Sequence, residues 1–488
     1  MKKIVSLALA LCLLLSVFSF ANAESDKVTV RLWRPTFNLN QVDEEQLQKV
    51  ENAINEYIAD KINVQIKLTD IPSGEFADNA NMAVNNREID LLWTASWQSV
   101  VGTKDLLANG AALDITDLLP GTKVYESMAE SAWEATADGG RNYFIPVYKD
   151  NVEGYDFLFR KEMVDKYGWD VTTVKTLADL EPMLADAKAE GLKYPYLSQK
   201  TAMFYRWYLD SFDFVTHDST FPMIVVSNET KELVNAIQTP EYAEFAKLMG
   251  EWAEKGYLSE DDLTKTTTDT TTQTQDWAVT WWTDLPVNAE AESRYNQEVV
   301  LQPATNRYAH SESAKGSCYA ITTTDETVAK AAIEFMGLLY TDSTLADIYT
   351  FGIEGEDFEY TQTEEQTIKH VTQHSDKYNH SMWESASATI VTPMYNEPDN
   401  KAELYGEFNG GALTAAAATF SIDWTGLEAE KSACQNLFDQ YGFVLENGGV
   451  APDAVDAYIA QYQEALDDAG FQKILEAVTE QYNAWKAE

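Results

Sequence analysis

The first part of the chain alternates between two hydrophobic periods. Three segments rich in β-branched and apolar side chains predict strands, at 28–33, 62–71 and 89–94. Between them, Glu44–Ala59 and Glu75–Asn85 repeat apolar positions with helical spacing, and Asp43 is placed to cap the first helix. A strand-helix-strand-helix-strand order predicts parallel strand pairing in an α/β lobe.

Aromatic and polar groups follow each of these strands. Trp33–Phe37 ends the first strand, Pro72–Gly74 the second and Thr94–Trp97 the third. In parallel sheets, ligands bind beyond the carboxyl ends of the strands. We therefore expect this edge of the sheet to contribute to a binding site.

The middle of the chain shows both periods again. Further strands are predicted at 155–159, 277–282, 299–301 and 318–322. Helices are predicted at 161–167, 177–189, 202–212, 241–254 and 326–339. A threonine-rich run at 264–274 predicts a loop or an exposed strand edge, and from residue 451 the chain is helical, with helices expected at 453–469 and 472–485.

The first 23 residues have the three regions of a secretory signal. Lys2 and Lys3 are followed by the apolar run Ile4–Phe20 and by the small residues of Ala21–Ala23, where a signal peptidase would cut. The apolar run is near the ~17-residue lower limit of a membrane span, so an uncleaved anchor is the alternative. The rest of the chain is expected to work outside the cytoplasm, secreted or associated with the outer face of the cell membrane.

Charge narrows the range of partners. The chain has 35 Lys plus Arg against 79 Asp plus Glu, a formal net charge of −44. Such a field repels nucleic acids and anionic lipid headgroups, so neither is an expected partner. After the signal, no apolar run reaches the ~18 residues of a transmembrane helix.

Aromatic side chains are abundant enough to supply both a core and a binding surface. The chain has 13 Trp, 25 Tyr and 20 Phe, and the face of a sugar ring can stack on an aromatic ring. Trp281 and Trp282 end a predicted strand, so one should point to each face of its sheet. Trp93 and Trp97 are similar candidates, whereas Trp207 in an aromatic helix is expected in the core.

Cysteine and histidine give no clear metal or cofactor site. Cys12 lies inside the apolar signal, and one bridge between Cys318 and Cys434 is left open. His370 and His374 are four apart, a zinc-compatible spacing on a helix, with His380 following, but the segment is polar and favours a solvated surface. No phosphate-binding glycine loop and no nucleophile elbow are present, so no cofactor is expected.

Several segments resemble the type 1 extracellular solute-binding proteins of ABC importers. Gly139–Pro146, GGRNYFIP, resembles their crossover into the second lobe, and Phe159–Gly168, FRKEMVDKYG, resembles the helix that follows. Ile89–Leu92 resembles the strand before the first cleft loop. These single motifs are short, and their order along the chain carries the resemblance.

Later segments resemble the LipO-like branch of this family. Leu338–Asp342, LLYTD, and Phe351–Gly355, FGIEG, are similar to one signature of that branch. Phe420–Asp423, FSID, is similar to the start of its C-terminal domain of unknown function, and Asp468–Ile474 with Gln481–Trp485 is similar to the end of that domain. The resemblance covers residues 28–485.

The resemblance implies an α/β, periplasmic-binding-protein-like fold. Two α/β lobes would be joined by crossover hinge segments, with a mainly helical C-terminal extension. The bounds expected on this basis are a signal at 1–23, an N-terminal lobe at 24–148 to which 290–345 return, a C-terminal lobe at 149–289 with about 346–414, and a LipO-like domain at 415–488.

The resemblance also implies a function that is not enzymatic. Carbohydrate, commonly an oligosaccharide, would be captured by lobe closure and passed to the permease subunits of an ABC transporter, with the protein as a monomer. Aromatic platforms and polar groups would hold the sugar. Eight candidates are chosen from strand ends and crossovers: Trp33, Phe37, Trp97, Tyr148, Asn151, Trp281, Trp282 and Asp284.

Other functions fit the same residues. A secreted glycoside hydrolase would share the compartment and the aromatic side chains, but among 79 acidic residues no carboxylate pair stands out. A sensor or adhesion protein that binds carbohydrate without import, and a peptide-binding importer component, are further alternatives. Family members in Gram-positive cells are usually lipid-anchored, whereas Cys12 follows Leu11 and lacks the small residue that lipid attachment needs.

Overall fold

The computed structural model describes residues 27–199, 203–216, 220–264 and 273–487. The secretory signal predicted at 1–23 and most of the threonine-rich run lie outside these ranges. Within them, no helix combines the length and the apolar character that a membrane span requires.

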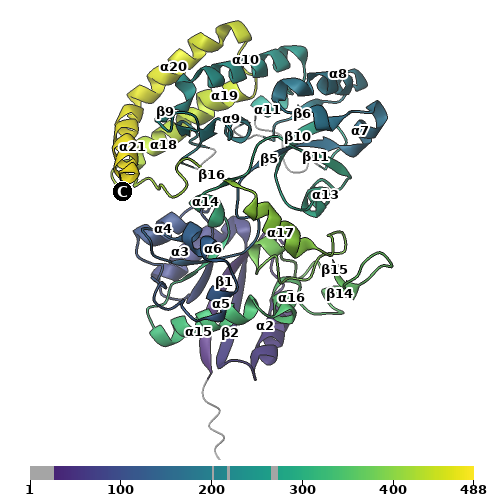
Figure 1. Cartoon of the computed structure of the whole chain (residues 1–488), viewed down its shortest axis with the longest axis vertical. Coiled ribbons are helices and arrows are strands. Elements are labelled where there is room, and N and C mark those ends of the chain that lie inside the picture. The colour runs from purple at the N-terminus through teal and green to yellow at the C-terminus, as the bar shows by residue number, and fades with distance from the viewer. Residues whose placement is uncertain (1–26, 200–202, 217–219, 265–272, 488) are drawn as a thin grey trace, which may run out of the picture.

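The described chain folds into two lobes (Figure 1). The first lobe contains a five-stranded sheet in the order β2-β1-β3-β13-β4. Its strands are β1 (Val28–Thr36), β2 (Val64–Pro72), β3 (Leu91–Thr94), β4 (Phe144–Pro146) and β13 (Cys318–Ile321). Strand β1 is parallel to both β2 and β3, which confirms the parallel pairing predicted from the alternation of strands and helices.

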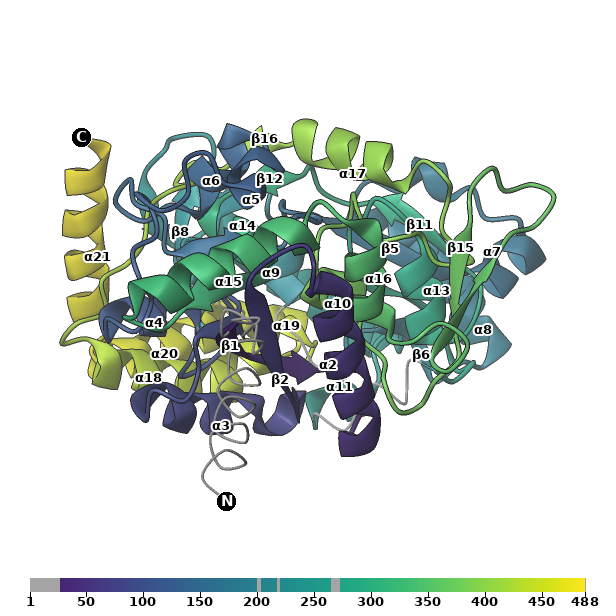
Figure 2. The same ribbon diagram turned by 90° about the horizontal axis from the view of Figure 1, so that it is seen from below.

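Helices cover this sheet on both sides. They are α2 (Glu44–Ile58), α3 (Ser73–Asn85), α4 (Thr103–Ala108), α5 (Lys123–Glu126), α6 (Glu130–Thr136), α15 (Glu326–Leu339) and α16 (Ser343–Phe351). From below, α15 crosses β1 and α2 lies beside β2 (Figure 2). Asp43 caps α2 as predicted, because its side chain accepts a hydrogen bond from the backbone N–H of Gln46 at 3.0 Å.

The second lobe contains a four-stranded sheet in the order β11-β5-β10-β6. Its strands are β5 (Tyr155–Arg160), β6 (Tyr194–Leu197), β10 (Trp277–Thr283) and β11 (Val299–Pro303), and a smaller sheet holds β7 (Phe212–Asp213), β8 (Ile224–Ser227) and β9 (Leu233–Asn235). The helices are α7 (Lys161–Tyr167), α8 (Glu181–Glu190), α9 (Met203–Trp207), α10 (Pro240–Lys255), α11 (Glu260–Leu263) and α13 (Ala289–Tyr295).

One helix is shorter than its sequence pattern predicts. The aromatic run at 202–212 was expected to be helical throughout, but α9 ends at Trp207 and Phe212 begins strand β7. A helix and a strand can both bury aromatic side chains, so the aromatic pattern alone does not distinguish them. Here Phe212 is in a strand because it pairs with Ser227 of β8.

Three chain segments cross between the lobes. Residues 147–154 connect β4 to β5, and 304–317 connect β11 to β13. The third passes through α17 (Lys401–Gly410) and β16 (Leu413–Thr414), which pairs with β12 (Tyr308–Ala309) of the second segment, close to α14 (Ser311–Ala314). Figure 1 shows these elements together at the junction of the lobes.

The domain bounds expected from the sequence differ from this packing. Strand β11 pairs with β5 and so belongs to the second lobe, although 290–345 were assigned to the first. The hydrophobic core of the first lobe also includes Leu345 through Val391, although about 346–414 were assigned to the second. This stretch carries β14 (Phe358–Thr361), β15 (His370–Gln373) and the 3-10 turn η4 (Met382–Glu384).

The C-terminal helices pack on the second lobe (Figure 1). They are α18 (Glu428–Leu437), α19 (Phe443–Glu446), α20 (Val455–Asp468) and α21 (Phe471–Lys486). One continuous core joins Phe245 and Trp252 of α10 to Tyr462 and Tyr482 of the tail. The helical extension expected from the resemblance is therefore present and shares the core of the second lobe.

Candidate functional site

Four aromatic rings meet at the carboxyl edge of the first-lobe sheet. Phe37 follows β1, Trp93 lies within β3, Trp97 follows β3, and Trp383 lies in η4. The ring centroids of Phe37 and Trp383 are 4.8 Å apart, those of Phe37 and Trp97 5.9 Å, and those of Trp93 and Trp97 5.8 Å. Trp93 is buried, whereas Trp97 is 53% exposed, so the cluster presents an aromatic surface to solvent. We call these four residues the first-lobe aromatic cluster.

The parallel sheet and a crossover place this cluster at the junction of the lobes. Strands β1 and β3 are parallel neighbours, so the residues that follow them lie at the same sheet edge. The indole N–H of Trp97 donates to the carbonyl of Gly316 at 2.7 Å, and the backbone N–H of Ser96 donates to the carbonyl of Lys315 at 2.9 Å. Gly316 and Lys315 belong to the crossover 304–317, so the cluster lies beside the hinge.

A second aromatic group lies at the corresponding edge of the second lobe. The Arg206 guanidinium lies 3.9 Å from the centroid of the Trp281 ring, and Tyr155 meets that ring edge-on at 6.1 Å. Trp281 is half-buried near the end of β10, paired with Phe157 of β5. Because β5 begins where the crossover 147–154 ends, Trp281 also lies on the hinge side of its lobe.

The adjacent tryptophans of β10 point to opposite faces, as predicted. Trp281 packs against the large core of the second lobe, whereas Trp282 packs against a smaller core on the other face. The Trp282 ring meets Tyr295 edge-on at 5.5 Å. Trp207 stacks on Phe157 at 4.6 Å against the large core, which agrees with the core position expected for it.

The eight candidate residues fall into three groups in the structure. Phe37 and Trp97 meet in the first-lobe aromatic cluster, and Trp281 lies in the group on the second lobe. Trp33 and Trp282 pack against the cores of their lobes. Tyr148, Asn151 and Asp284 lie in or beside the crossovers.

The three crossover candidates are engaged in hinge contacts. The Asn151 side chain accepts a hydrogen bond from the Lys149 backbone N–H at 3.0 Å and donates to the Val147 carbonyl at 3.3 Å. Buried Asp284 forms an ion pair with Arg307 at 2.5 Å. The carbonyl of Tyr148 accepts a hydrogen bond from the Ala388 N–H at 2.7 Å. These contacts indicate that Asn151 and Asp284 shape the hinge.

Sequence patterns gave no reason to select Trp383 or Arg206. Trp383 lies far from the strands in sequence, on a turn with no periodic pattern, and only the tertiary fold brings it to Phe37. Arg206 lies in the helix α9, where the surrounding aromatic residues predict a core position and give no reason to select an arginine. The capping-box spacing of Ser381 and Glu384 was a local signal for this turn.

A buried network of charged side chains lies next to the first-lobe aromatic cluster and joins β1 and β2 to the segment that carries Trp383. The Arg34 guanidinium contacts the Asp70 carboxylate at 2.7 and 3.3 Å, and His380 Nε2 lies 2.8 Å from that carboxylate. Burial alone would raise the pKa of Asp70, but the charges of Arg34 and His380 outweigh it and hold this pKa at about 2. Burial and Arg34 lower the pKa of His380, but contact with Asp70 and Glu384 outweighs them, so the net pKa is raised.

Two of the histidines, His370 and His380, are each paired with a carboxylate. His370 is buried on strand β15, where its Nε2 lies 2.7 Å from Asp399, and His380 is buried beside Asp70. The solvated surface expected for this segment is therefore wrong for both residues, while His374 is exposed. The described residues contain no group of three side chains that could hold a metal ion. Cys318 and Cys434 are buried, unbridged and in different lobes.

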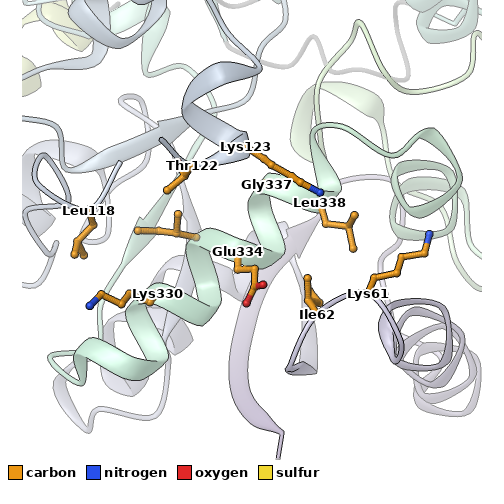
Figure 3. Close-up of a pocket in the computed structure, with 10 residues that line it drawn as sticks. Lys61, Ile62, Leu118, Thr122, Lys123, Lys330, Glu334, Gly337 and Leu338 are labelled. Atoms are coloured by element: carbon orange, nitrogen blue, oxygen red, sulfur yellow. The ribbon is translucent and has the colours of Figure 1, made fainter. Parts of the chain in front are cut away.

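A separate cavity lies at the opposite edge of the first-lobe sheet (Figure 3). It has a volume of about 400 Å³ and is lined by Lys61, Ile62, Leu118, Thr122, Lys123, Lys330, Ile333, Glu334, Gly337 and Leu338. Ile62 precedes the start of β2, so this cavity is at the amino edge of the strands and away from the aromatic cluster. It is not the site predicted from the strand ends.

Comparisons with known proteins agree with this architecture. Residues 416–487 match a family described as a domain of unknown function, DUF3502. The chain is 23% identical over 460 residues to a carbohydrate ABC transporter substrate-binding protein of Streptococcus pneumoniae serotype 4, covering 92% of this chain and 91% of that relative.

Solved structures show the same fold. The N-glycan transport solute-binding protein NgtS of Streptococcus pneumoniae superposes with a TM-score of 0.79 at 20% identity, covering 94% of this chain and 99% of that one. Its complex with Man1GlcNAc gives a TM-score of 0.72 at 20% identity, over 95% and 100%. A human-milk-oligosaccharide (HMO) binding, ABC-transporter-associated protein of Bifidobacterium longum infantis gives 0.62 at 16%, over 94% and 99%.

These likenesses confirm the resemblance that the sequence motifs indicated, including the C-terminal domain of unknown function. The chain has the two-lobed fold of the solute-binding proteins of ABC importers and ends in a DUF3502 domain.

Proposed function

We propose that this protein captures an oligosaccharide between its two lobes, outside the cytoplasm, and delivers it to the permease of an ABC importer. The observation that carries the proposal is the exposed ring of Trp97, set in an aromatic cluster beside the hinge. The relatives support a carbohydrate ligand, because their names record carbohydrate, N-glycan and HMO binding.

The chemistry of the two aromatic groups suits a sugar. Pyranose rings present C–H groups on their faces, and these pack against the negative face of an aromatic ring. Trp97 would serve from the first lobe and Trp281 from the second, so that closure brings a ring to each side of the sugar. Arg206, stacked on Trp281, would hold a hydroxyl at the edge of that ring.

Replacing Trp97 by alanine should weaken glycan binding about tenfold, because a lost stacking contact costs on the order of 1 kcal/mol. Isothermal titration calorimetry with Man5GlcNAc would measure the loss. Tyr395→Ala is the matched control, since Tyr395 is 59% exposed on the same lobe but has no contact with the cluster. Equal affinities of wild type and Trp97→Ala would contradict the assignment of this ring.

A thermal-shift screen of glycans tests the proposal as a whole. A ligand at 100 times its Kd should stabilise the protein by about 2.7 kcal/mol. A flat response to N-glycan and milk oligosaccharides, with a response to a peptide library, would favour a peptide-binding component instead. Recovery of the glycan uncleaved after long incubation distinguishes capture from hydrolysis.

A further inference from the structure

The turn that carries Trp383 is held by several contacts, among them those of the buried residues His380 and Glu384 and a hydrogen bond from Asn38 to Ser381 at 3.1 Å. Trp383 lies in η4, a single 3-10 turn, with His380 just before it and Glu384 at its end. Both flanking side chains are buried, and the Glu384 carboxylate accepts a hydrogen bond from the Ser381 backbone N–H at 2.6 Å. A side chain on such a short turn has little intrinsic order, so its place depends on what anchors the turn.

His380 anchors this turn to the sheet. Its Nε2 lies 2.8 Å from the Asp70 carboxylate near the end of β2, and its Nδ1 lies 3.5 Å from Glu384. Asp70 is held in turn by Arg34 of β1 at 2.7 Å. The turn is thereby tied to the carboxyl ends of the two strands that lie next to Phe37.

The partner ring of Trp383 belongs to Phe37, which directly follows strand β1. Phe37 lies three residues beyond Arg34, and its ring centroid is 4.8 Å from that of Trp383. Arg34 also donates to the carbonyl of Tyr349 at 2.8 Å, which fixes its own position. A displacement of His380 from Asp70 would therefore move Trp383 relative to Phe37 while the strand stays in place.

On the basis of the function proposed above, we infer that His380 is a positioning residue for the binding site: its contact with Asp70 sets Trp383 against Phe37 and completes the aromatic surface that receives the sugar. His380 does not need to touch the ligand. The raised pKa of His380 agrees with this role, because a protonated ring is attracted to the carboxylates of Asp70 and Glu384. Arg34 is the one cation facing it among the described contacts and opposes that charge.

Three variants test the inference by calorimetry with Man5GlcNAc. His380→Leu should weaken binding about tenfold, as Trp383→Ala does. His380→Gln should recover most of the affinity, because its amide can still donate to Asp70. The double variant His380→Leu/Trp383→Ala should bind no more weakly than Trp383→Ala alone, since both changes remove the same ring from the surface.

A second buried histidine provides the matched control. His370 is fully buried in the same lobe and pairs with Asp399 at 2.7 Å, and its contacts among the described residues do not include the cluster. His370→Leu should lower the melting temperature and leave the glycan affinity unchanged. Wild-type affinity for His380→Leu, or multiplicative losses in the double variant, would overturn the inference.

A spectroscopic measurement keeps the inference separate from the proposed function. The near-UV circular dichroism of the packed tryptophans should change in His380→Leu as it does in Trp383→Phe, and should remain in His370→Leu. If the wild type bound no glycan, the proposed function would fail, and this spectrum would still decide whether His380 positions Trp383. An unchanged spectrum in a folded His380→Leu would reject the inference, whereas His380→Gln should keep the wild-type spectrum.

Discussion

Replacing Arg34 by methionine should lower the free energy of unfolding by about 3–5 kcal/mol, because it leaves the Asp70 carboxylate buried without its main cationic partner. The side chains of Arg34 and Asp70 are almost completely buried, with 1% and 4% of their surface exposed. The change also removes the hydrogen bond to the Tyr349 carbonyl and the contact with the Tyr378 hydroxyl. Urea unfolding of the two proteins, followed by fluorescence, would measure the difference.

An exposed ion pair provides the control for this change. Lys161 and Asp165 pair at 2.6 Å on α7, with 39% and 62% of their side chains exposed. Lys161→Met should leave the free energy of unfolding almost unchanged, because solvent screens exposed pairs. A loss of less than about 1 kcal/mol in Arg34→Met would show that the buried network contributes little to stability.

The same network sets how the protein responds to acid. The pKa of Asp70 is about 2 in the folded protein, below its ordinary value of 3.8. A lowered pKa stabilises the fold above the unfolded value, and that contribution is lost as pH falls from about 5 to about 2. Asp70→Asn should therefore remove part of the acid dependence of unfolding, besides lowering stability at neutral pH.

Raising the pH should destabilise the protein through the buried acid Asp156, and Asp156→Asn should reduce this dependence. Burial, followed by repulsion from Asp284, raises the pKa of Asp156 to about 8, while Arg307 acts in the opposite direction. An acid with a raised pKa favours the folded state most below its unfolded value, and this contribution disappears as pH rises from about 4 to about 8. The expected loss is on the order of 3–5 kcal/mol.

The measurement is the free energy of unfolding across pH 4–9. The wild type should fall steeply over this range, and Asp156→Asn should be flatter and more stable above pH 8. Asp165→Asn, which changes an exposed acid of the same lobe, should follow the wild type. Parallel curves for wild type and Asp156→Asn would mean that Asp156 is ionised in the folded protein at neutral pH.

Local pattern was sufficient for most of the framework. The alternation at 62–71 predicted β2, and the cap at Asp43 predicted the start of α2, because both depend on neighbours in sequence. The opposite placement of Trp281 and Trp282 followed from the two-residue period of a strand. These inferences needed no knowledge of the tertiary fold.

The proposed binding surface could be predicted only in part, because much of it depends on distant contacts. Phe37 and Trp97 follow strands and were selected, but Trp383 reaches them on a turn held by distant residues, among them Asp70, which contacts His380 310 positions away. Asn151 and Asp284 were selected as polar groups beside the site, yet partners in the crossovers engage both side chains. Sequence position placed them beside the crossovers and could not show which neighbours would engage their side chains.

The core shared by the second lobe and the C-terminal helices has a consequence for synthesis. The first-lobe core is complete once Val391 has been made, whereas the second-lobe core needs both Phe157 and Tyr482. During synthesis, the second-lobe core therefore cannot be completed until the last helix has emerged, and its apolar surface stays uncovered until then. That interval is when this chain is most exposed to aggregation and proteolysis. Premature termination within the last helices would leave the apolar surface uncovered permanently.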